Sequence, residues 1–253
     1  MPMSGLEMIE KLREESFNKE TERRLASHNY IKAAKNGTLS LSQKQAFARE
    51  QYFVQLSDAT SFALLAGHKN FTPSSLTGTS VPDQQSLSSI NKSNAQEGVD
   101  LFQFLLGGEV YAAPLLLTYA KSVGLDETSL QSPEKHGYSI SAKAQTYPSY
   151  WARLALSGKR AAGAAACAVN FPAWGNACRL LLEALVEHDD GKYAGVDDAG
   201  LAFIKFLATP IQDLDTMAAS IIDEEGVSYE ELVEPVRLLQ EYELMFWDGI
   251  FEK

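Results

Sequence analysis

The sequence predicts an all-α fold, a single-domain multi-helix bundle over residues 1–253, on three observations. Apolar residues recur at helical spacing in nearly every long segment. Alternating apolar and polar runs bounded by hairpin dipeptides, which would indicate strands, are nearly absent. The stretch Ala161–His188 is apolar almost all round, so other helices must cover it on most sides. The sequence contains no internal repeat and no recognisable domain linker, so we expect a single domain.

The predicted helices follow one another with short breaks. The first covers 5–27, where dense charge surrounds sparse apolar positions. Ser40 stands where it would cap a helix running to about Leu65. Later helices are expected over 96–123 (with an interruption left open at Gly107-Gly108), 142–156, 161–188, 198–223 and 228–251. The polar stretches 70–93 and 189–197 are expected to be loops.

Composition and charge exclude several classes of function. The net charge is −11, with 33 acidic against 22 basic residues, which disfavours a protein that binds nucleic acid through phosphate contacts. The apolar runs look too short to cross a bilayer, and the region after Glu7 lacks the apolar core of a signal peptide. Two cysteines supply no disulfide framework, which fits a reducing cytosol. We therefore expect a cytoplasmic protein with no nucleic-acid or membrane partner.

Two residues are candidates for catalysis. Cys167 lies mid-helix among alanines, whose small side chains would leave room beside it, although a buried free cysteine is more often simple packing. Glu243 lies at helical spacing from Phe246 and Trp247 and so borders an apolar face. A carboxyl group in that setting can have a raised pKa and act as an acid or base. A salt-bridged or solvent-reaching glutamate fits the local pattern equally well.

No metal or cofactor is expected. Di-iron helical bundles use Glu-x-x-His pairs on facing helices. Of the four histidines, only His188 has helical carboxylates nearby, and no matching motif stands elsewhere. The pattern favours a solvated helix end, where the histidine interacts with the helix dipole. Gly-rich phosphate loops and Gly-x-Ser-x-Gly elbows are also absent.

Three blocks of sequence stand in a characteristic order. They are His28-Asn29-Tyr30 with Asn36-Gly37-Thr38-Leu39, then Cys167-Ala-Val-Asn-Phe-Pro-Ala-Trp-Gly175, then Glu243-Leu-Met-Phe-Trp-Asp248. This order resembles the TenA/thiaminase-2 family, with its His-Pro-Phe and Asp-Gly-Thr-Leu, its Cys-x-Trp-x-Tyr-x-x-Ile-Gly and its Glu-x-x-Phe-Trp-Asp patterns. Ala208-Thr209-Pro210 is a weaker echo of that family's Ala-Ser-Pro. The resemblance implies the heme-oxygenase-like helical bundle.

The resemblance also implies an activity. In the family a cysteine thiolate adds to the ring of an aminopyrimidine, a leaving group departs from the methyl carbon, and water replaces it. The product is the hydroxymethylpyrimidine used in thiamin salvage. At the matching positions of this sequence, Cys167 would be the nucleophile and Glu243 would be the general acid and base. The resemblance further implies a homodimer or homotetramer.

At several positions that bind the substrate in the family, this sequence has a different residue. The family's Gln-Asp pair aligns with Glu50-Gln51, so its amidine-binding aspartate becomes Gln51. Glutamine can hydrogen-bond an amidine but supplies no negative charge, and Glu50 could substitute only if the helix were rotated by one residue. A tyrosine one turn after the cysteine becomes Phe171, and another becomes Leu207 or Phe206.

The stacking tyrosine ahead of the cysteine survives as Tyr147, with Tyr150 as a competing position. Two functions therefore stay open. The first is an aminopyrimidine hydrolase of thiaminase-2 type, in which Tyr147 and Phe171 form the ring walls and Gln51 contacts the amidine. The second is a non-catalytic binding protein for a pyrimidine or another flat heterocycle on the same fold. The lack of paired Glu-x-x-His motifs in the sequence disfavours a metal-dependent oxidase.

Overall fold

The computed structural model describes residues 3–68, 99–188 and 198–253, and these residues form helices and no strand. The all-α prediction is therefore confirmed. The expected loops 70–93 and 189–197 lie outside the described residues. The elements are α1 (Gly5–Glu14), α2 (Ser16–Ala26), α3 (Asn29–Lys35), α4 (Leu41–Leu65), α6 (Leu101–Ser122), α7 (Glu127–Gln131), the 3-10 turn η1 (Pro133–His136), α8 (Thr146–Leu156), α9 (Arg160–Glu187), α10 (Asp198–Ala208), α11 (Leu214–Glu225) and α12 (Tyr229–Phe251).

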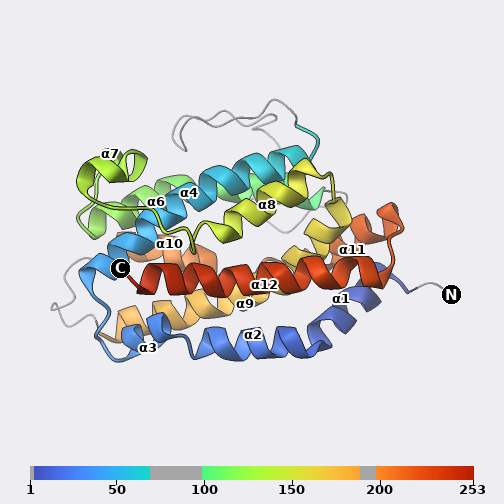
Figure 1. Ribbon diagram of the computed structural model, residues 1–253, viewed down its shortest axis with the longest axis horizontal. Coiled ribbons are helices and arrows are strands. Elements are labelled where there is room, and N and C mark those ends of the chain that lie inside the picture. The colour runs from blue at the N-terminus through green and yellow to red at the C-terminus, as the bar shows by residue number, and fades with distance from the viewer. Residues whose placement is uncertain (1–2, 69–98, 189–197) are drawn as a thin grey trace.

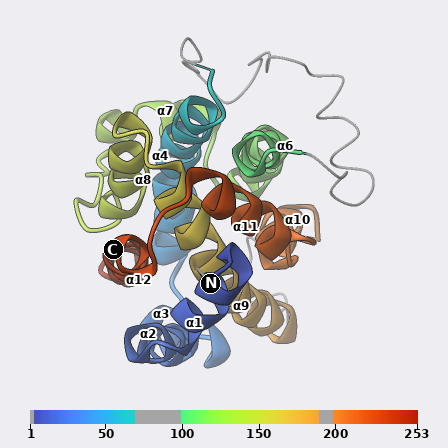
Figure 2. The same cartoon turned by 90° about the vertical axis from the view of Figure 1, so that its right-hand side faces the viewer.

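The helix α9 is covered by other helices along its first part, as its composition predicts, whereas its later part has an exposed face that includes Arg179 and Glu183. It contacts α10, α11 and α12, the N-terminal helices α1 to α3, and α8. Its first part, 161–170, is buried at every position, because alanine and glycine let neighbouring helices approach closely. Figure 1 places α4, α6 and α8 above α9 and α12, with α2 and α3 along the opposite side. In the end view of Figure 2, α10 lies between α6 and α9, and it contacts both.

Several helix ends follow from local sequence. Ser40 caps α4 by a capping box with Gln43. Asp100 caps α6, accepting from the backbone N–H groups of Phe102 and Gln103. The helix α6 therefore begins at Leu101, later than expected, and it runs without interruption through Gly107-Gly108.

Three further predicted helix boundaries were wrong. The expected helix over 198–223 is two helices, because Pro210 lacks an N–H group and disfavours helical geometry at Thr209. The N-terminal helix is divided at Glu15, whose backbone is extended. The helix expected from 142 begins at Thr146, since the preceding residues form turns. The first of these corrections matters most for function, because the segment joining α10 to α11 borders a cavity.

Candidate active site

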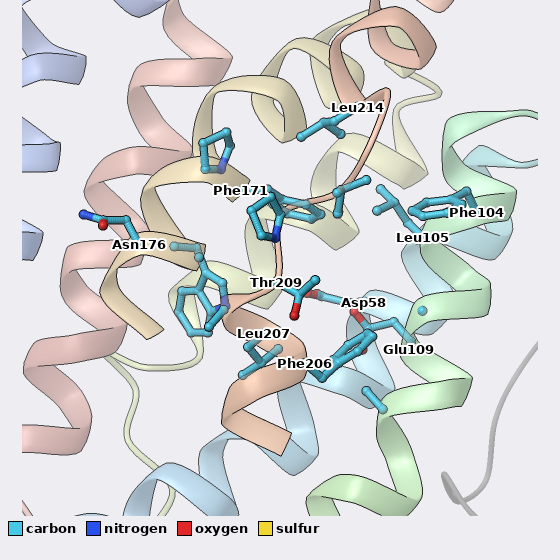
Figure 3. Close-up of a pocket in the computed structure, with 18 of the residues that line it drawn as sticks. Asp58, Phe104, Leu105, Glu109, Phe171, Asn176, Phe206, Leu207, Thr209 and Leu214 are labelled. Carbon is cyan, nitrogen blue, oxygen red and sulfur yellow. The ribbon is translucent and has the colours of Figure 1, made fainter. Parts of the chain in front are cut away.

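A cavity of about 770 Å³ lies between α4, α6, α8, α9 and the segment that joins α10 to α11. Its wall is largely apolar, and Figure 3 shows Phe104, Leu105, Phe171, Phe206 and Leu207 around it. Thr209 and the segment after it form the edge on the α10–α11 side. The size and lining suit a small flat molecule held by a few polar groups.

Two aromatic rings are stacked in one wall of the cavity. Tyr147 from α8 and Trp174 from α9 have ring centroids 6.0 Å apart and an interplanar angle of 19°. Among the positions that the sequence singled out, Tyr147, Phe171, Leu207 and Gln51 all line the cavity. The competing Tyr150 does not, and its ring contacts Tyr242 at 5.3 Å. Trp174 was missed by the sequence reasoning, although it falls in the same block as Cys167.

Cys167 is fully buried in α9, one turn before Phe171. It does not itself line the cavity, which reaches its neighbours Phe171 and Tyr147. Burial raises the pKa of the Cys167 thiol well above its usual value, and the nearby carboxyl group of Asp58 raises it further. At neutral pH the side chain is therefore a thiol, and forming a thiolate requires a group that accepts its proton.

Glu243 is fully buried in α12 and belongs to a hydrogen-bond network. One carboxylate oxygen accepts from Asn170 Nδ2, and the other lies 3.4 Å from Trp247 Nε1. Burial raises the pKa of Glu243 to about 8, although these two donors oppose the rise. The Tyr147 hydroxyl donates to Asn170 Oδ1 at 3.0 Å, so the network joins Glu243 to the cavity wall. Asn170 was also missed by the sequence reasoning.

Four polar side chains face the cavity from α4 and α6: Gln51, Gln55, Asp58 and Glu109. The first three lie on one face of α4, at spacings of four and three residues. Gln51 Nε2, Gln55 Oε1 and Asp58 Oδ1 have no hydrogen-bond partner within the protein. The sequence reasoning missed Gln55, Asp58 and Glu109. The signal that could have found them is a polar stripe at helical spacing on a helix whose other positions are largely apolar.

The family model for the TENA/THI-4/PQQC family matches residues 18–253. The chain belongs to this family. Among solved structures, the TenA homologue protein from P. horikoshii OT3 aligns with a TM-score of 0.64 and 15% identity, over 97% of this chain and 98% of that one. A TenA homolog from Pseudomonas syringae pv. tomato str. DC3000 aligns with a TM-score of 0.64 and 14% identity, over 99% and 94%. These likenesses show the heme-oxygenase-like fold, and no curated protein sequence matches the chain.

The first and last blocks shared with the TENA/THI-4/PQQC family meet in space. His28 accepts from the backbone N–H of Tyr30 at the start of α3, and its other ring nitrogen lies 3.0 Å from Asp248 Oδ1 in α12. Its ring also contacts those of Trp247 and Phe251. These contacts join the N-terminal helices to α12, so these two blocks have a structural role outside the cavity.

Glu50 does not reach the cavity. Its two carboxylate oxygens accept from the Tyr138 hydroxyl at 2.7 Å, the Ser141 backbone N–H at 2.7 Å and Gln145 Nε2 at 2.6 Å. Adjacent residues of a helix point about 100° apart, so Gln51 faces the cavity while Glu50 faces the loop that precedes α8. Of these two neighbours, Gln51 therefore lines the cavity and Glu50 does not.

The described part of the chain holds no group of three or more histidine, cysteine, aspartate or glutamate side chains that could bind a metal ion. His188, the one histidine weighed as a ligand, lies 2.6 Å from the Lys35 backbone oxygen through Nε2.

The helix α6 is long and apolar enough, by length and composition, to cross a membrane, which the short apolar runs did not suggest. It packs against α4 and α10 inside the bundle, as the core helix of a water-soluble protein does. The one charged side chain facing the cavity from α6 is Glu109.

Proposed function

We propose that this protein is an aminopyrimidine hydrolase of thiaminase-2 type, which converts an aminopyrimidine carrying a leaving group on its methyl carbon into the hydroxymethylpyrimidine. The observation that carries the proposal is the cavity itself. A stacked aromatic wall of Tyr147 and Trp174 lies beside the helix that bears Cys167, and a buried acid, Glu243, connects to that wall through Asn170. Aromatic walls suit a flat ring, and a protonated buried carboxyl group suits proton transfer.

In the proposed reaction, Cys167 Sγ bonds to a ring carbon while a ring nitrogen gains a proton. The leaving group then departs from the methyl carbon with its bonding electron pair and a proton, and water adds at that carbon. The sulfur–carbon bond breaks, the thiol regains its proton, and the ring becomes aromatic again. The sum is substrate plus water giving the alcohol plus the protonated leaving group.

Glu243 carries a proton below about pH 8, and we assign it the role of the general acid and base for the ring nitrogen. The proposal requires the cavity to admit the ring past Phe171 and Tyr147 as far as Cys167, which lies one turn behind Phe171. Gln51, which lines the cavity, is the residue we assign to the amidine edge of the ring.

The test is to incubate the protein with thiamin and with aminomethyl-aminopyrimidine, beside the Cys167→Ala variant, and to follow hydroxymethylpyrimidine by chromatography. We expect product from the native protein and none from the variant. Because Ala164, Ala165, Ala166 and Ala168 already surround this position, the variant should fold, and circular dichroism checks this. Unimpaired turnover by the folded variant would exclude Cys167 as the nucleophile.

The second candidate is a non-catalytic protein that binds a flat heterocycle. It is favoured by the burial of Cys167, which raises the thiol pKa and keeps the side chain out of the cavity lining. This candidate predicts saturable ligand binding with no product from either substrate. Release of hydroxymethylpyrimidine by the native protein would rule it out.

Three wider expectations stay proposals: a cytoplasmic location, a homodimer or homotetramer, and a small-molecule partner. Light scattering coupled to size exclusion would measure the mass in solution against the 27.8 kDa of one chain. A monomer would contradict the oligomer.

A further inference from the structure

A chain of buried side-chain amides runs from the start of α2 to Glu243. Its members are Asn18 of α2, Gln240 of α12 and Asn170 of α9, which are fully buried and bond to one another in that order. We propose that Asn18 and Gln240 are positioning residues, which hold the Asn170 amide with its nitrogen against Glu243 and its oxygen against Tyr147. The helix α12 packs against α2, α8 and α9, and Figure 1 shows it between α2 and α8.

The orientation of the chain is set by a backbone oxygen that can only accept a hydrogen bond. The helix α1 ends at Glu14, and carbonyl groups in a last helical turn have no partner within the helix. Asn18 Nδ2 donates to the Arg13 backbone oxygen at 3.2 Å and lies 3.4 Å from Glu22 Oε1. Because both contacts are acceptors, the Asn18 atom that faces them is the nitrogen, and its oxygen faces Gln240.

Each amide passes this constraint to the next, because it offers one oxygen acceptor and one nitrogen donor. Gln240 Nε2 donates to Asn18 Oδ1, so Gln240 Oε1 accepts from Asn170 Nδ2, at 2.9 Å. Asn170 Nδ2 has a second hydrogen, which it donates to Glu243 Oε2. Asn170 Oδ1 accepts from the Tyr147 hydroxyl at 3.0 Å. If one amide turned over, two oxygen atoms or two NH₂ groups would face each other.

The orientation of Asn170 affects how readily Glu243 loses its proton. Burial raises the pKa of Glu243 to about 8, and hydrogen bonds from Trp247 and Asn170 oppose the rise by stabilising the ionised carboxylate. If the Asn170 amide turned over, its oxygen would face the carboxyl group, which could then bond to it only in the protonated form. The pKa of Glu243 would therefore rise further.

The other titratable groups nearby do not supply this control. The Tyr147 hydroxyl of α8 and the Cys178 thiol of α9 interact with Glu243, and both are uncharged at neutral pH because burial raises their pKa values. Asp58 of α4 acts on Tyr147 rather than on Glu243. Glu22 of α2 is exposed, at the far end of the amide chain. Hydrogen bonding from Asn170 is therefore the effect that the chain can change.

This inference deepens the proposed function, and it rests on that function only where turnover is measured. A buried polar network with all its bonds made also favours one packing of the core, so a loss of stability alone would not distinguish positioning from a structural role. The pKa of Glu243 makes the distinction, because Asn18 and Gln240 do not bond to Glu243 and can change its pKa only through Asn170.

The test uses Gln240→Met and Asn18→Leu, which remove one amide each from the chain. Glu243 is titrated by NMR of the protein labelled with carbon-13 at its glutamate carboxyl groups, and Glu243→Gln identifies the signal. In both variants Asn170 can turn over, so the pKa of Glu243 should rise from about 8 to about 9 or above. Unfolding melts verify that the variants fold. If Gln240→Met does not fold, Asn18→Leu, at the far end of the chain from Glu243, decides the question.

The matched control is Gln45→Met, the same chemical change at a different place in the bundle. Gln45 Nε2 donates to the Val123 backbone oxygen at 2.9 Å, and this bond has no link to the amide chain. The control should lose stability while the pKa of Glu243 stays within about 0.3 of its native value. A Glu243 pKa that is unchanged or lower in the folded chain variants, or that rises equally in Gln45→Met, would overturn the proposal.

Turnover gives a second readout if the native protein is a hydrolase. The pH above which turnover declines should then move upward in Gln240→Met and Asn18→Leu together with the pKa of Glu243, and it should not move in Gln45→Met. A native protein that converts neither thiamin nor aminomethyl-aminopyrimidine would contradict the proposed hydrolase. The carboxyl titration would still decide whether Asn18 and Gln240 orient Asn170, because it needs no substrate.

Discussion

Buried glutamates in this protein differ in what completes their hydrogen bonding. Glu50 and Glu243 are both fully buried, but Glu50 accepts three hydrogen bonds from side-chain and backbone donors, while Glu243 accepts from two side chains only. Burial dominates at Glu243 and raises its pKa to about 8. Glu50 anchors the loop before α8, whereas a proton on Glu243 is what the proposed reaction requires.

Glu243→Gln tests this distinction at a single residue. Glutamine can still accept from Asn170, so the fold should hold, but the side chain can no longer exchange a proton. We expect turnover of aminomethyl-aminopyrimidine to fall by about 10²- to 10⁴-fold. In the native protein, the turnover rate should decline above about pH 8, because Glu243 loses the proton that the reaction needs. Full activity in the variant would remove Glu243 from the mechanism.

At the scale of elements, the loop between η1 and α8 is held in place by contacts with α4 and α12. Glu50 of α4 binds Tyr138, the Ser141 backbone and Gln145, and Gly249 of α12 lets the same loop approach closely. This loop leads directly into α8, which carries the cavity residue Tyr147. The position of one cavity wall therefore depends on contacts made by residues that never reach the cavity.

Glu50→Ala should lower the free energy of unfolding by about 3 kcal/mol, because the buried Ser141 N–H and two partly buried side-chain donors lose their acceptor. Urea titration followed by circular dichroism measures this change. Glu134→Ala removes an exposed carboxylate from the neighbouring 3-10 turn and serves as the control, with an expected change within about 0.5 kcal/mol. A similar small change in both variants would contradict the anchoring role.

Gly249→Ala should destabilise the protein by about 1–3 kcal/mol. A Cβ atom there would lie 2.6 Å from Ser141 Oγ and 2.7 Å from the Ala144 backbone nitrogen, so the loop would have to move. Gly108→Ala is the matched comparison, because its added Cβ would meet only Phe206 Cζ, at 3.9 Å. That variant should be neutral or stabilised by up to about 1 kcal/mol, since alanine favours helices. Equal urea midpoints for the two variants would show that the loop can move without lowering the free energy of unfolding.

Over the whole molecule, the bundle keeps several carboxyl groups in low-dielectric surroundings while its surface is strongly acidic, with a net charge of −11. Asp58, Glu109 and Glu243 all have pKa values raised mainly by burial. Exposed carboxylates at helix N-termini, such as Glu7 and Glu231, have pKa values lowered by hydrogen bonds to serine caps. The two groups of acids have opposite effects on the pH dependence of stability.

Stability should fall as the pH rises from about 5 to about 8. A carboxyl group whose pKa is raised on folding binds more protons in the native state, so its contribution is complete below its unfolded pKa and is lost as the pH rises toward the folded one. The lowered pKa values act only at more acidic pH, where stability should fall again. His28, whose pKa is lowered by burial, opposes the trend near neutrality as a single group.

Urea midpoints across this pH range measure the trend. A protein with Asp58→Asn, Glu109→Gln and Glu243→Gln combined should show a much flatter profile above pH 5, since amides do not titrate. A native profile that rises toward pH 8 would show that the three carboxyl groups are not the ones that control stability there.

Local sequence determined a large part of this protein. The all-α class, the cap of α4 at Ser40 and the burial of the first part of α9, 161–170, follow from helical periodicity and capping, which act over a few residues. The spacing of the shared blocks determined the family, and it placed Tyr147, Phe171 and Gln51 among residues that do line the cavity. The roles of Cys167 and Glu243 in catalysis stay predictions.

Only the tertiary structure decided which side chains meet. Glu50 and Gln51 are neighbours in sequence, but they face different elements because each residue turns the helix by about 100°. Asp58 and Glu109 are joined in one cavity by the packing of α4 on α6, which no local pattern specifies. Periodicity assigns residues to a face of a helix, whereas the identity of the helix opposite that face, and any cavity left between them, depends on contacts between distant parts of the chain.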